Sequence, residues 1–172
     1  MKKYIFLSLF LLSFSSIFAQ DLFSAARENN VKQIEELLSK GSNINEANER
    51  GFTPLILAVY NNSSDAAKLL LSKGANPNAQ DLSGNNALMG ATFRGYPEMT
   101  NLLIANKADV NQVNFNGASS LIFAVTFGQN EIAEKLIESG ADLNIKDNTG
   151  KTALDHAVLQ ENKVMIEYLS HK

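Results

Sequence analysis

The chain repeats itself every 33 residues, with small and apolar residues returning at fixed offsets. A period of this length is typical of stacked small units, each of which buries its apolar face only against its neighbours. Stacks of this kind build surfaces rather than enclosed active sites, so the pattern favours recognition over catalysis. The repeat has a glycine phase, a leucine phase and an alanine phase, formed by Gly51, Gly84, Gly117 and Gly150; Leu22, Leu55, Leu88, Leu121 and Leu154; and Ala25, Ala58, Ala91, Ala124 and Ala157.

Residues 1–19 have the composition of an export signal and not of a repeat. Two lysines precede an almost wholly apolar run at residues 4–14, and Ala19 is a small residue suited to cleavage before Gln20. Because a permanent membrane helix needs about 20 apolar residues, we expect a cleaved signal and no stable membrane insertion afterwards. The short lysine-led signal and the asparagine-rich loops predict an exported, periplasmic protein of bacterial origin. The alternatives are secretion, or a tether formed by the uncleaved signal.

Composition narrows the classes of function further. The chain has no cysteine, which excludes disulfides, thiol chemistry and a lipid-modified cysteine at the cleavage point. Its formal net charge is -3, and signal removal takes away two of the fifteen basic residues and none of the eighteen acidic ones, leaving -5. Binding to a phosphate backbone requires clustered lysine and arginine. We therefore expect no nucleic-acid partner.

Residues 53–79 predict two short antiparallel helices followed by a loop. Thr53 is suited to cap the first helix, and Pro54 stands at its first position, where a missing N–H costs nothing. Residues 61–63 break that helix, and Gly74 suits the left-handed conformation that ends the second one. Apolar spacing of three and four residues marks the buried face. The positions expected on it are Leu55, Ala58, Val59, Ala66, Ala67, Leu69 and Leu70.

Three segments carry a family likeness: residues 51–55 (Gly-Phe-Thr-Pro-Leu), residues 68–71 (Lys-Leu-Leu-Leu) with Gly74, and residues 150–154 (Gly-Lys-Thr-Ala-Leu). With their copies 33 residues apart, they resemble ankyrin repeats over about residues 21–172. The resemblance implies an all-α repeat solenoid of stacked helix-turn-helix units with hairpin-like loops. The expected domain covers residues 20–172 and contains five units, numbered one to five, at residues 21–50, 51–83, 84–116, 117–149 and 150–172.

Departures from the family pattern concentrate in unit three. The complete Thr-Pro-Leu occurs only at residues 53–55, and Lys107 stands where other units have a helix-ending glycine. A left-handed residue that is not glycine costs on the order of 1 kcal/mol, and Gly90 inside a helix costs about as much. We therefore predict unit three to be the least stable. The histidine with which the family ties its loop to the helix is also replaced, which predicts the loss of that tie at Ile56, Met89, Ile122 and Asp155.

Both ends of the stack have residues suited to capping. Asp21 is an apt N-cap for a first helix that begins directly after the signal. Polar residues in the final helix can close the stack against further growth. These residues are Asn162, Lys163, Glu167, His171 and Lys172.

The resemblance implies that hairpin tips and the concave face of the first helices bind a partner protein. Aromatic residues and arginine supply most of the binding energy at protein interfaces, and both types occur at these places. The alternative for each ring is that it only packs on the neighbouring unit. The predicted partner-binding residues are Arg50, Phe52, Tyr60, Phe93, Arg94, Phe115 and Phe127.

The residues give little support to catalysis. Asp155 and His156 are adjacent on a predicted helix, point in different directions and lack a third catalytic group. No spacing of potential ligands suggests a zinc site, and the glycines follow the repeat rather than a phosphate loop. We thus expect no enzyme activity, cofactor or metal, and a monomer that binds protein. Two alternative functions fit the same residues: inhibition or protection of an envelope or secreted enzyme, and a scaffold that bridges two proteins.

Overall fold

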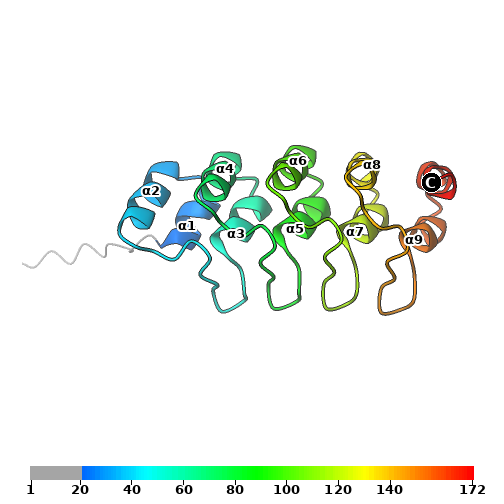
Figure 1. The fold of residues 1–172 in the computed structure, drawn as a ribbon, viewed down its shortest axis with the longest axis horizontal. Coiled ribbons are helices and arrows are strands. Elements are labelled where there is room, and N and C mark those ends of the chain that lie inside the picture. The colour runs from blue at the N-terminus through cyan, green and yellow to red at the C-terminus, as the bar shows by residue number, and fades with distance from the viewer. Residues whose placement is uncertain (1–20) are drawn as a thin grey trace, which may run out of the picture.

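A computed structural model describes residues 21–172, so the predicted signal at residues 1–19 and its cleavage point lie outside the described residues. This part of the chain folds into ten helices and contains no β-strand, which confirms the predicted all-α repeat solenoid (Figure 1). The helices are α1 (Leu22–Arg27), α2 (Val31–Ser39), α3 (Pro54–Tyr60), α4 (Ser64–Ser72), α5 (Ala87–Arg94), α6 (Pro97–Ala105), α7 (Ser120–Thr126), α8 (Asn130–Glu138), α9 (Ala153–Leu159) and α10 (Lys163–Ser170).

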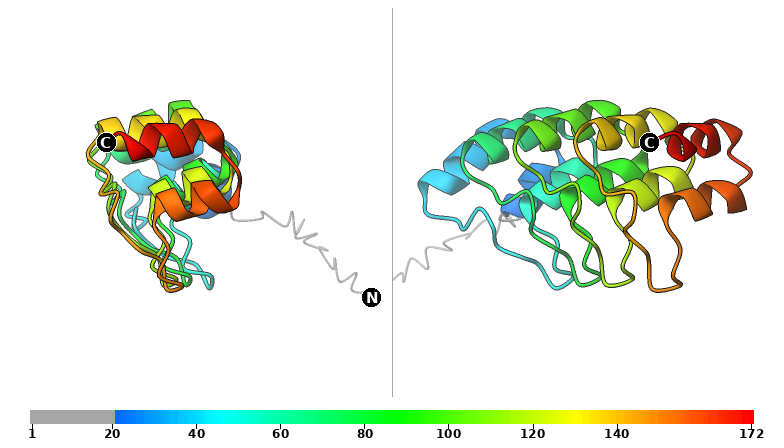
Figure 2. Two further views of the ribbon diagram at one scale, coloured as in Figure 1. Left: turned by 90° about the vertical axis from the view of Figure 1, so that its right-hand side faces the viewer. Right: turned by 45° about the vertical axis from the view of Figure 1, so that its right-hand side comes forward.

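The helices form two layers along one row. The inner helices α1, α3, α5, α7 and α9 each contact the next inner helix, and each also packs on the outer helix that follows it in the chain. Figure 2 shows the two layers, with hairpin-like loops projecting from one edge of the stack. We call these loops fingers one to four, and their ends are residues 48–52, 81–85, 114–118 and 147–151.

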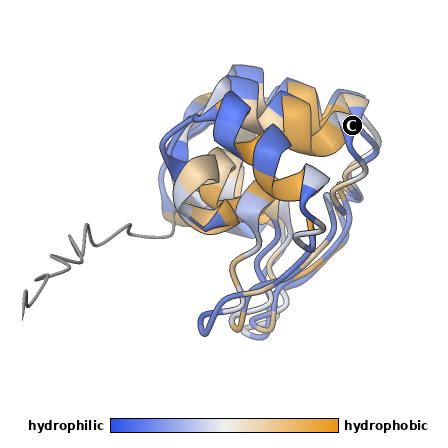
Figure 3. Cartoon of the chain, turned by 90° about the vertical axis from the view of Figure 1, so that its left-hand side faces the viewer, coloured by the Kyte–Doolittle hydropathy of each residue, from blue (hydrophilic) through white to orange (hydrophobic). Residues whose placement is uncertain are grey.

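Small side chains allow the inner helices to approach one another. Every alanine of the 33-residue phase within these helices is fully buried. Figure 3 shows apolar segments on the helices, whereas the fingers are mostly hydrophilic with a few apolar positions. A leucine in place of one of these alanines would overpack the contact between units. The buried alanines are Ala25, Ala58, Ala91, Ala124 and Ala157.

Unit two forms as its sequence predicts. The Thr53 hydroxyl accepts a hydrogen bond from the backbone N–H of Ile56 at 3.3 Å, and Pro54 is the first residue of α3. Gly74 follows α4 with φ +91°, which confirms the left-handed ending. The predicted core positions Leu55, Ala58, Val59, Ala66, Ala67 and Leu70 are buried, and Leu69 is half-buried.

Unit three contains both predicted irregularities, and the structure explains one of them. Lys107 is left-handed with φ +65°. Gly90 is buried in α5, where a Cβ atom would lie 2.9 Å from Cε2 of Tyr60. The glycine that looked like a helix defect therefore makes room for a ring from the preceding unit.

The prediction that the loop-to-helix tie is lost in every unit is wrong for unit five. Nε2 of His156 lies 2.7 Å from Oδ2 of Asp147, and the two side chains are nearly buried. This pair joins finger four to α9. Asp155 also forms hydrogen bonds, because its carboxylate accepts from the backbone N–H and the hydroxyl of Thr152 in a capping box.

The two ends of the stack differ. Oδ1 of Asp21 accepts a hydrogen bond from the backbone N–H of Ser24 at 2.7 Å, which confirms the predicted N-cap. The last unit has the expected polar residues but is less polar than predicted, since Val158, Leu159 and Val164 are all more than half exposed. The residues equivalent to Val158 in units two, three and four are fully buried by the following unit, and they are Val59, Thr92 and Val125.

Candidate partner-binding surface

Each finger is held by one asparagine or aspartate, a feature that sequence reasoning missed. In finger two, Oδ1 of Asp81 accepts hydrogen bonds from the backbone N–H groups of Ser83 and Asn85 at 2.8 and 2.9 Å. The same pair of bonds, to the residues two and four positions later, occurs in every finger. The 33-residue recurrence of this side chain was the available signal, at Asn48, Asp81, Asn114 and Asp147.

Neighbouring fingers are joined into a row by backbone hydrogen bonds. Leu82 N–H donates to Arg50 C=O at 3.1 Å, and Phe115 N–H donates to Ser83 C=O at 3.1 Å. The third link is between Asn148 N–H and Asn116 C=O at 2.9 Å. The fingertips are therefore held at fixed positions relative to one another.

A second set of hydrogen bonds joins the loops above the fingers. Side-chain oxygens of asparagines accept backbone N–H groups of the next unit at 2.7–2.8 Å. The pairs are Asn45 with Asn76, Asn78 with Asp109, and Asn111 with Asp142. These asparagine side chains thus hold neighbouring loops together, which is a structural role rather than a binding one.

Phe52 and Tyr60 form one group of predicted binding residues. Their ring centroids are 5.9 Å apart, both rings are half-buried, and the Tyr60 ring lies against Gly90. Burial raises the pKa of the Tyr60 hydroxyl, the charge of Asp81 raises it further, and the charge of Arg94 opposes the increase. This pair contributes to packing between units two and three as well as to the surface.

Phe93 and Phe127 form a second group at the ends of α5 and α7. Their rings meet edge to face with centroids 4.9 Å apart, and Phe127 also lies 5.8 Å from Phe123. Phe93 is 44% exposed and Phe127 is 47% exposed. Packing against each other therefore leaves nearly half of each ring open to solvent.

Arg94 is exposed beside this aromatic pair. Its Nε and Nη2 atoms donate to the Tyr96 hydroxyl at 3.2 and 3.1 Å, and its guanidinium lies 5.6 Å from the centroid of the Tyr96 ring. Within residues 21–172, Arg94 forms no ion pair.

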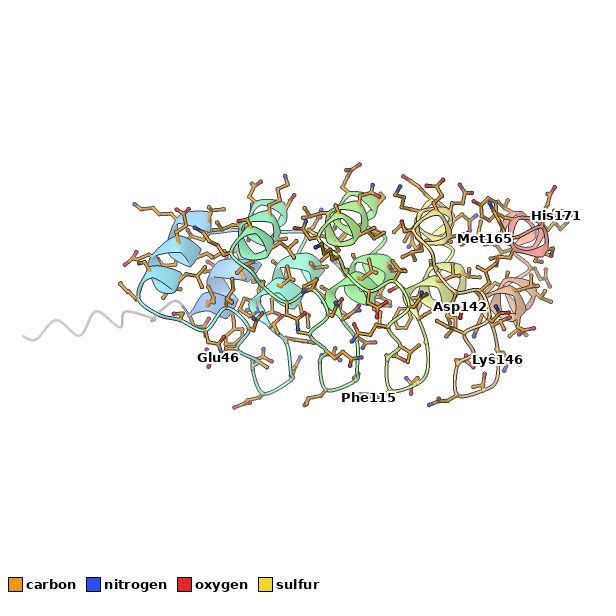
Figure 4. All side chains as sticks on the ribbon, viewed as in Figure 1. Glu46, Phe115, Asp142, Lys146, Met165 and His171 are labelled. Atoms are coloured by element: carbon orange, nitrogen blue, oxygen red, sulfur yellow. The ribbon has the colours of Figure 1, made fainter. Side chains whose placement is uncertain are left out.

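Phe115 lies at the end of finger three (Figure 4), and within residues 21–172 its ring packs on no other aromatic ring. Its ring lies against Gly84 of the preceding finger and is 67% exposed. Leu82, at the end of finger two, and Val113, on the arm of finger three, are exposed as well. Neither residue is among the seven predicted, although both are apolar residues in mainly polar loop sequences.

The structure thus places the seven predicted residues in three groups. Arg50 is exposed on finger one near the Phe52–Tyr60 pair, Arg94 accompanies the Phe93–Phe127 pair, and Phe115 belongs to the fingertips. One surface between residues 52 and 129 is formed by the finger ends, the inner helices and the turns that follow those helices. It exposes a single charged side chain, that of Arg94. This surface is otherwise neutral and partly apolar.

One pair of titratable side chains, between finger four and α9, lies close together. His156 faces Asp147 in finger four rather than its sequence neighbour Asp155. The Asp147 carboxylate accepts hydrogen bonds from the Thr149 hydroxyl, from His156 and from the backbone N–H groups of Lys151 and Thr149. These bonds hold the pKa of Asp147 below its usual range, although desolvation opposes the shift. The described part of the chain contains no group of three or more His, Cys, Asp or Glu that could hold a metal ion. None of its helices is long and apolar enough to cross a membrane.

Comparisons with known proteins agree with the repeat architecture. A family model described as ankyrin repeats (three copies) matches residues 22–114 and, in a second overlapping match, residues 88–172. A search of curated proteins gave no match.

Proposed function

Because the chain belongs to the ankyrin repeat family, we propose that it is a non-catalytic module that binds a partner protein on one face. Ankyrin repeats are generally protein–protein interaction modules, and the family is typically non-catalytic. The proposed face consists of the ends of fingers two and three, Val113 on the arm of finger three, and the C-terminal ends of α3, α5 and α7 with the turns that follow them.

The observation that carries this proposal is the distribution of exposed apolar side chains. Exposed apolar patches, such as the one formed by the paired Phe93 and Phe127 rings, mark interaction sites on soluble proteins, and aromatic rings supply large contact area at an interface. Most of the large apolar side chains that are exposed within residues 21–172 lie on this face. They are Leu82, Phe93, Val113, Phe115 and Phe127.

The outer helices give the contrasting case. Three ion pairs lie on them, each between residues three or four positions apart, and all six side chains are exposed. Exposed pairs of this kind contribute little stability and keep a surface well hydrated. The outer face is therefore the less suitable one for a protein partner. The three pairs are Lys40–Glu36, Lys68–Asp65 and Lys135–Glu138.

One apolar face suits binding of a single partner, which includes inhibition or protection of an envelope or secreted enzyme by masking its surface. A scaffold that bridges two proteins is the second candidate, because it needs a separate second contact. The exposed Val158, Leu159 and Val164 in unit five favour that alternative. Alanine substitution of these three residues should leave binding of the first partner unchanged and, in a scaffold, abolish binding of the second.

We also propose that the protein is exported to the periplasm, on the basis of the sequence of residues 1–19. Mass spectrometry of the protein from an envelope fraction should find an N-terminus at Gln20. Recovery of the uncleaved chain in the membrane fraction would instead support the tether.

The binding proposal is tested by capture from an envelope fraction of the source organism. We expect a protein retained by the parent chain to be lost by the Phe93→Ala, Phe127→Ala variant, because the two rings form the exposed aromatic pair. The matched control is Lys68→Ala, Asn101→Ala, which truncates two exposed side chains on α4 and α6. The proposed face would be contradicted if the control variant failed to capture the protein, or if the Phe93→Ala, Phe127→Ala variant still captured it.

A further inference from the structure

The Arg94 guanidinium is oriented but has no anionic partner. Two of its nitrogens donate to one neutral acceptor, the Tyr96 hydroxyl, and its planar group lies over the Tyr96 ring. Nη1 donates no hydrogen bond to any group within residues 21–172. An arginine fixed in this way loses less side-chain freedom when it binds an acceptor than a freely moving one does.

The surroundings of Arg94 lack any compensating charge. Phe93 and Phe127 are exposed beside it, and no other exposed charge occurs on this face across residues 52–129. The only carboxylate in this part of the face is Asp81, which is buried and accepts hydrogen bonds within its own finger. The proposed binding face therefore has one positive charge among apolar and neutral groups.

A partner that covers the Phe93–Phe127 pair removes water from Arg94 as well. Burial of an unpaired charge costs several kcal/mol, whereas a carboxylate can accept two parallel hydrogen bonds from a guanidinium. A phosphate group has nearly twice the charge of a carboxylate, and the face provides no second cation for it. A singly charged acceptor matches the charge present.

We propose that the partner protein presents an aspartate or glutamate next to apolar side chains, and that Arg94 binds its carboxylate beside the Phe93–Phe127 pair. This inference rests on the proposed function and names the chemistry of the partner. The two rings contact the apolar side chains, and Arg94 selects the acidic residue between or beside them.

The test uses a library of random twelve-residue peptides displayed on phage, selected on the chain and on single-residue variants of it. We expect the parent chain to enrich peptides with Asp or Glu beside aromatic or aliphatic residues. Arg94→Gln should weaken binding of those peptides by about thirtyfold or more, because truncation of one partner in a desolvated charge pair costs at least about 2 kcal/mol. Arg94→Glu should enrich Lys or Arg at the same position instead.

Matched variants separate the two proposals. Arg27→Gln makes the same change at an exposed arginine at the end of α1 and should leave peptide affinity unchanged. The selected peptides could instead be apolar and lack an acidic residue, bind Arg94→Gln as well as the parent chain, and fail to bind Phe93→Ala, Phe127→Ala. That result would overturn the inference and leave the proposed function intact. Tighter binding of phosphoserine peptides would also overturn it. Peptides unaffected by the aromatic variant, or a failure to select any peptide, would overturn both.

Discussion

Units two and three have the same fold, but their sequences suit it to different degrees. Unit two begins α3 with a threonine cap and ends α4 at Gly74, whose φ is +91°. Unit three begins α5 with Asn86, has Gly90 within that helix, and uses Lys107 with φ +65° where unit two has its glycine. Both the lysine and the internal glycine are unfavourable for the backbone.

Unit three also provides more of the candidate surface. Phe93, Arg94 and Phe115 all belong to it, and Phe127 of unit four packs edge to face on Phe93. At the positions equivalent to Phe93 and Arg94, unit two has Tyr60, which is half-buried, and Asn61. Unit two also has a left-handed residue that is not glycine, Asn62 with φ +55°, where unit three has Gly95. The comparison teaches that unit three combines an unfavourable helix ending and a glycine within a helix with the most developed exposed aromatic surface, as expected when stability and binding compete for the same residues.

The largest effect is expected from a change at the contact between fingers two and three. A Cβ atom on Gly84, whose φ is +78°, would lie 2.6 Å from the backbone nitrogen of Phe115. Gly84→Ala should therefore lower the free energy of unfolding by about 3 kcal/mol, of which about 1 comes from the positive φ and about 2 from overpacking. Urea unfolding, monitored by circular dichroism, measures the loss in unfolding free energy.

Gly150→Ala is the matched control for that variant. Gly150 has a similar φ of +81°, but a Cβ atom there would meet no atom within 4 Å. The expected loss is about 1 kcal/mol from the backbone alone. Equal losses for the two variants would show that close contact between fingers does not hold unit three in place.

A smaller difference is expected between the two helix caps. Asn86 is fully buried, accepts from Met89 N–H at 2.9 Å and donates to the Gln112 side chain at 2.8 Å. Asn86→Ala should cost about 2 kcal/mol, because it removes both a cap and a buried side-chain bond. Thr53→Ala removes only a cap and should cost about 1 kcal/mol. Denaturation midpoints of the two variants give the comparison, and a larger loss for Thr53→Ala would reverse the ranking.

Lys107→Gly should make unit three resemble unit two. A glycine relieves the left-handed strain, so the free energy of unfolding should rise by about 1 kcal/mol. Gly74→Ala should produce a loss of similar size in unit two. Thermal unfolding detects both changes, and a destabilised Lys107→Gly variant would mean that the lysine side chain has a stabilising contact that outweighs its strain.

The smallest net effect is expected at Gly90. Alanine gains about 1 kcal/mol in helix propensity, but its Cβ atom would press on the Tyr60 ring. The two terms should nearly cancel in the parent chain, whereas Gly90→Ala should stabilise a Tyr60→Ala background by about 1 kcal/mol. A double-mutant cycle measures the coupling. The same change in both backgrounds would show that Gly90 does not accommodate the ring.

The repeat made most of the fold predictable from the sequence. Thr53, Pro54 and Gly74 specify where helices begin and end through local hydrogen bonds and backbone preferences, and the structure confirms all three. The role of Gly90 could not be predicted in the same way, because it depends on a ring that lies 30 positions earlier in the chain. The pair formed by His156 and Asp147 was missed because finger and helix meet only after the loop has folded back.

The binding residues were less predictable than the framework. Sequence position placed Phe93, Phe115 and Phe127 at finger ends and helix ends, but it could not tell which rings pack together. The 4.9 Å contact between Phe93 and Phe127 and the isolation of Phe115 depend on how neighbouring units pack against one another. Exposure of Leu82 and Val113 likewise follows from how the fingers align, and the periodic pattern does not contain that information.

The central claim is that a partner covers the finger ends and the inner helix ends of units two to four. Amide hydrogen exchange of the chain, measured with and without the protein captured from the envelope fraction, tests it most directly. We predict protection at residues 82–85, 93–96, 115–118 and 126–129, with exchange in α4, α6 and α8 unchanged. Protection confined to those outer helices would contradict the claim.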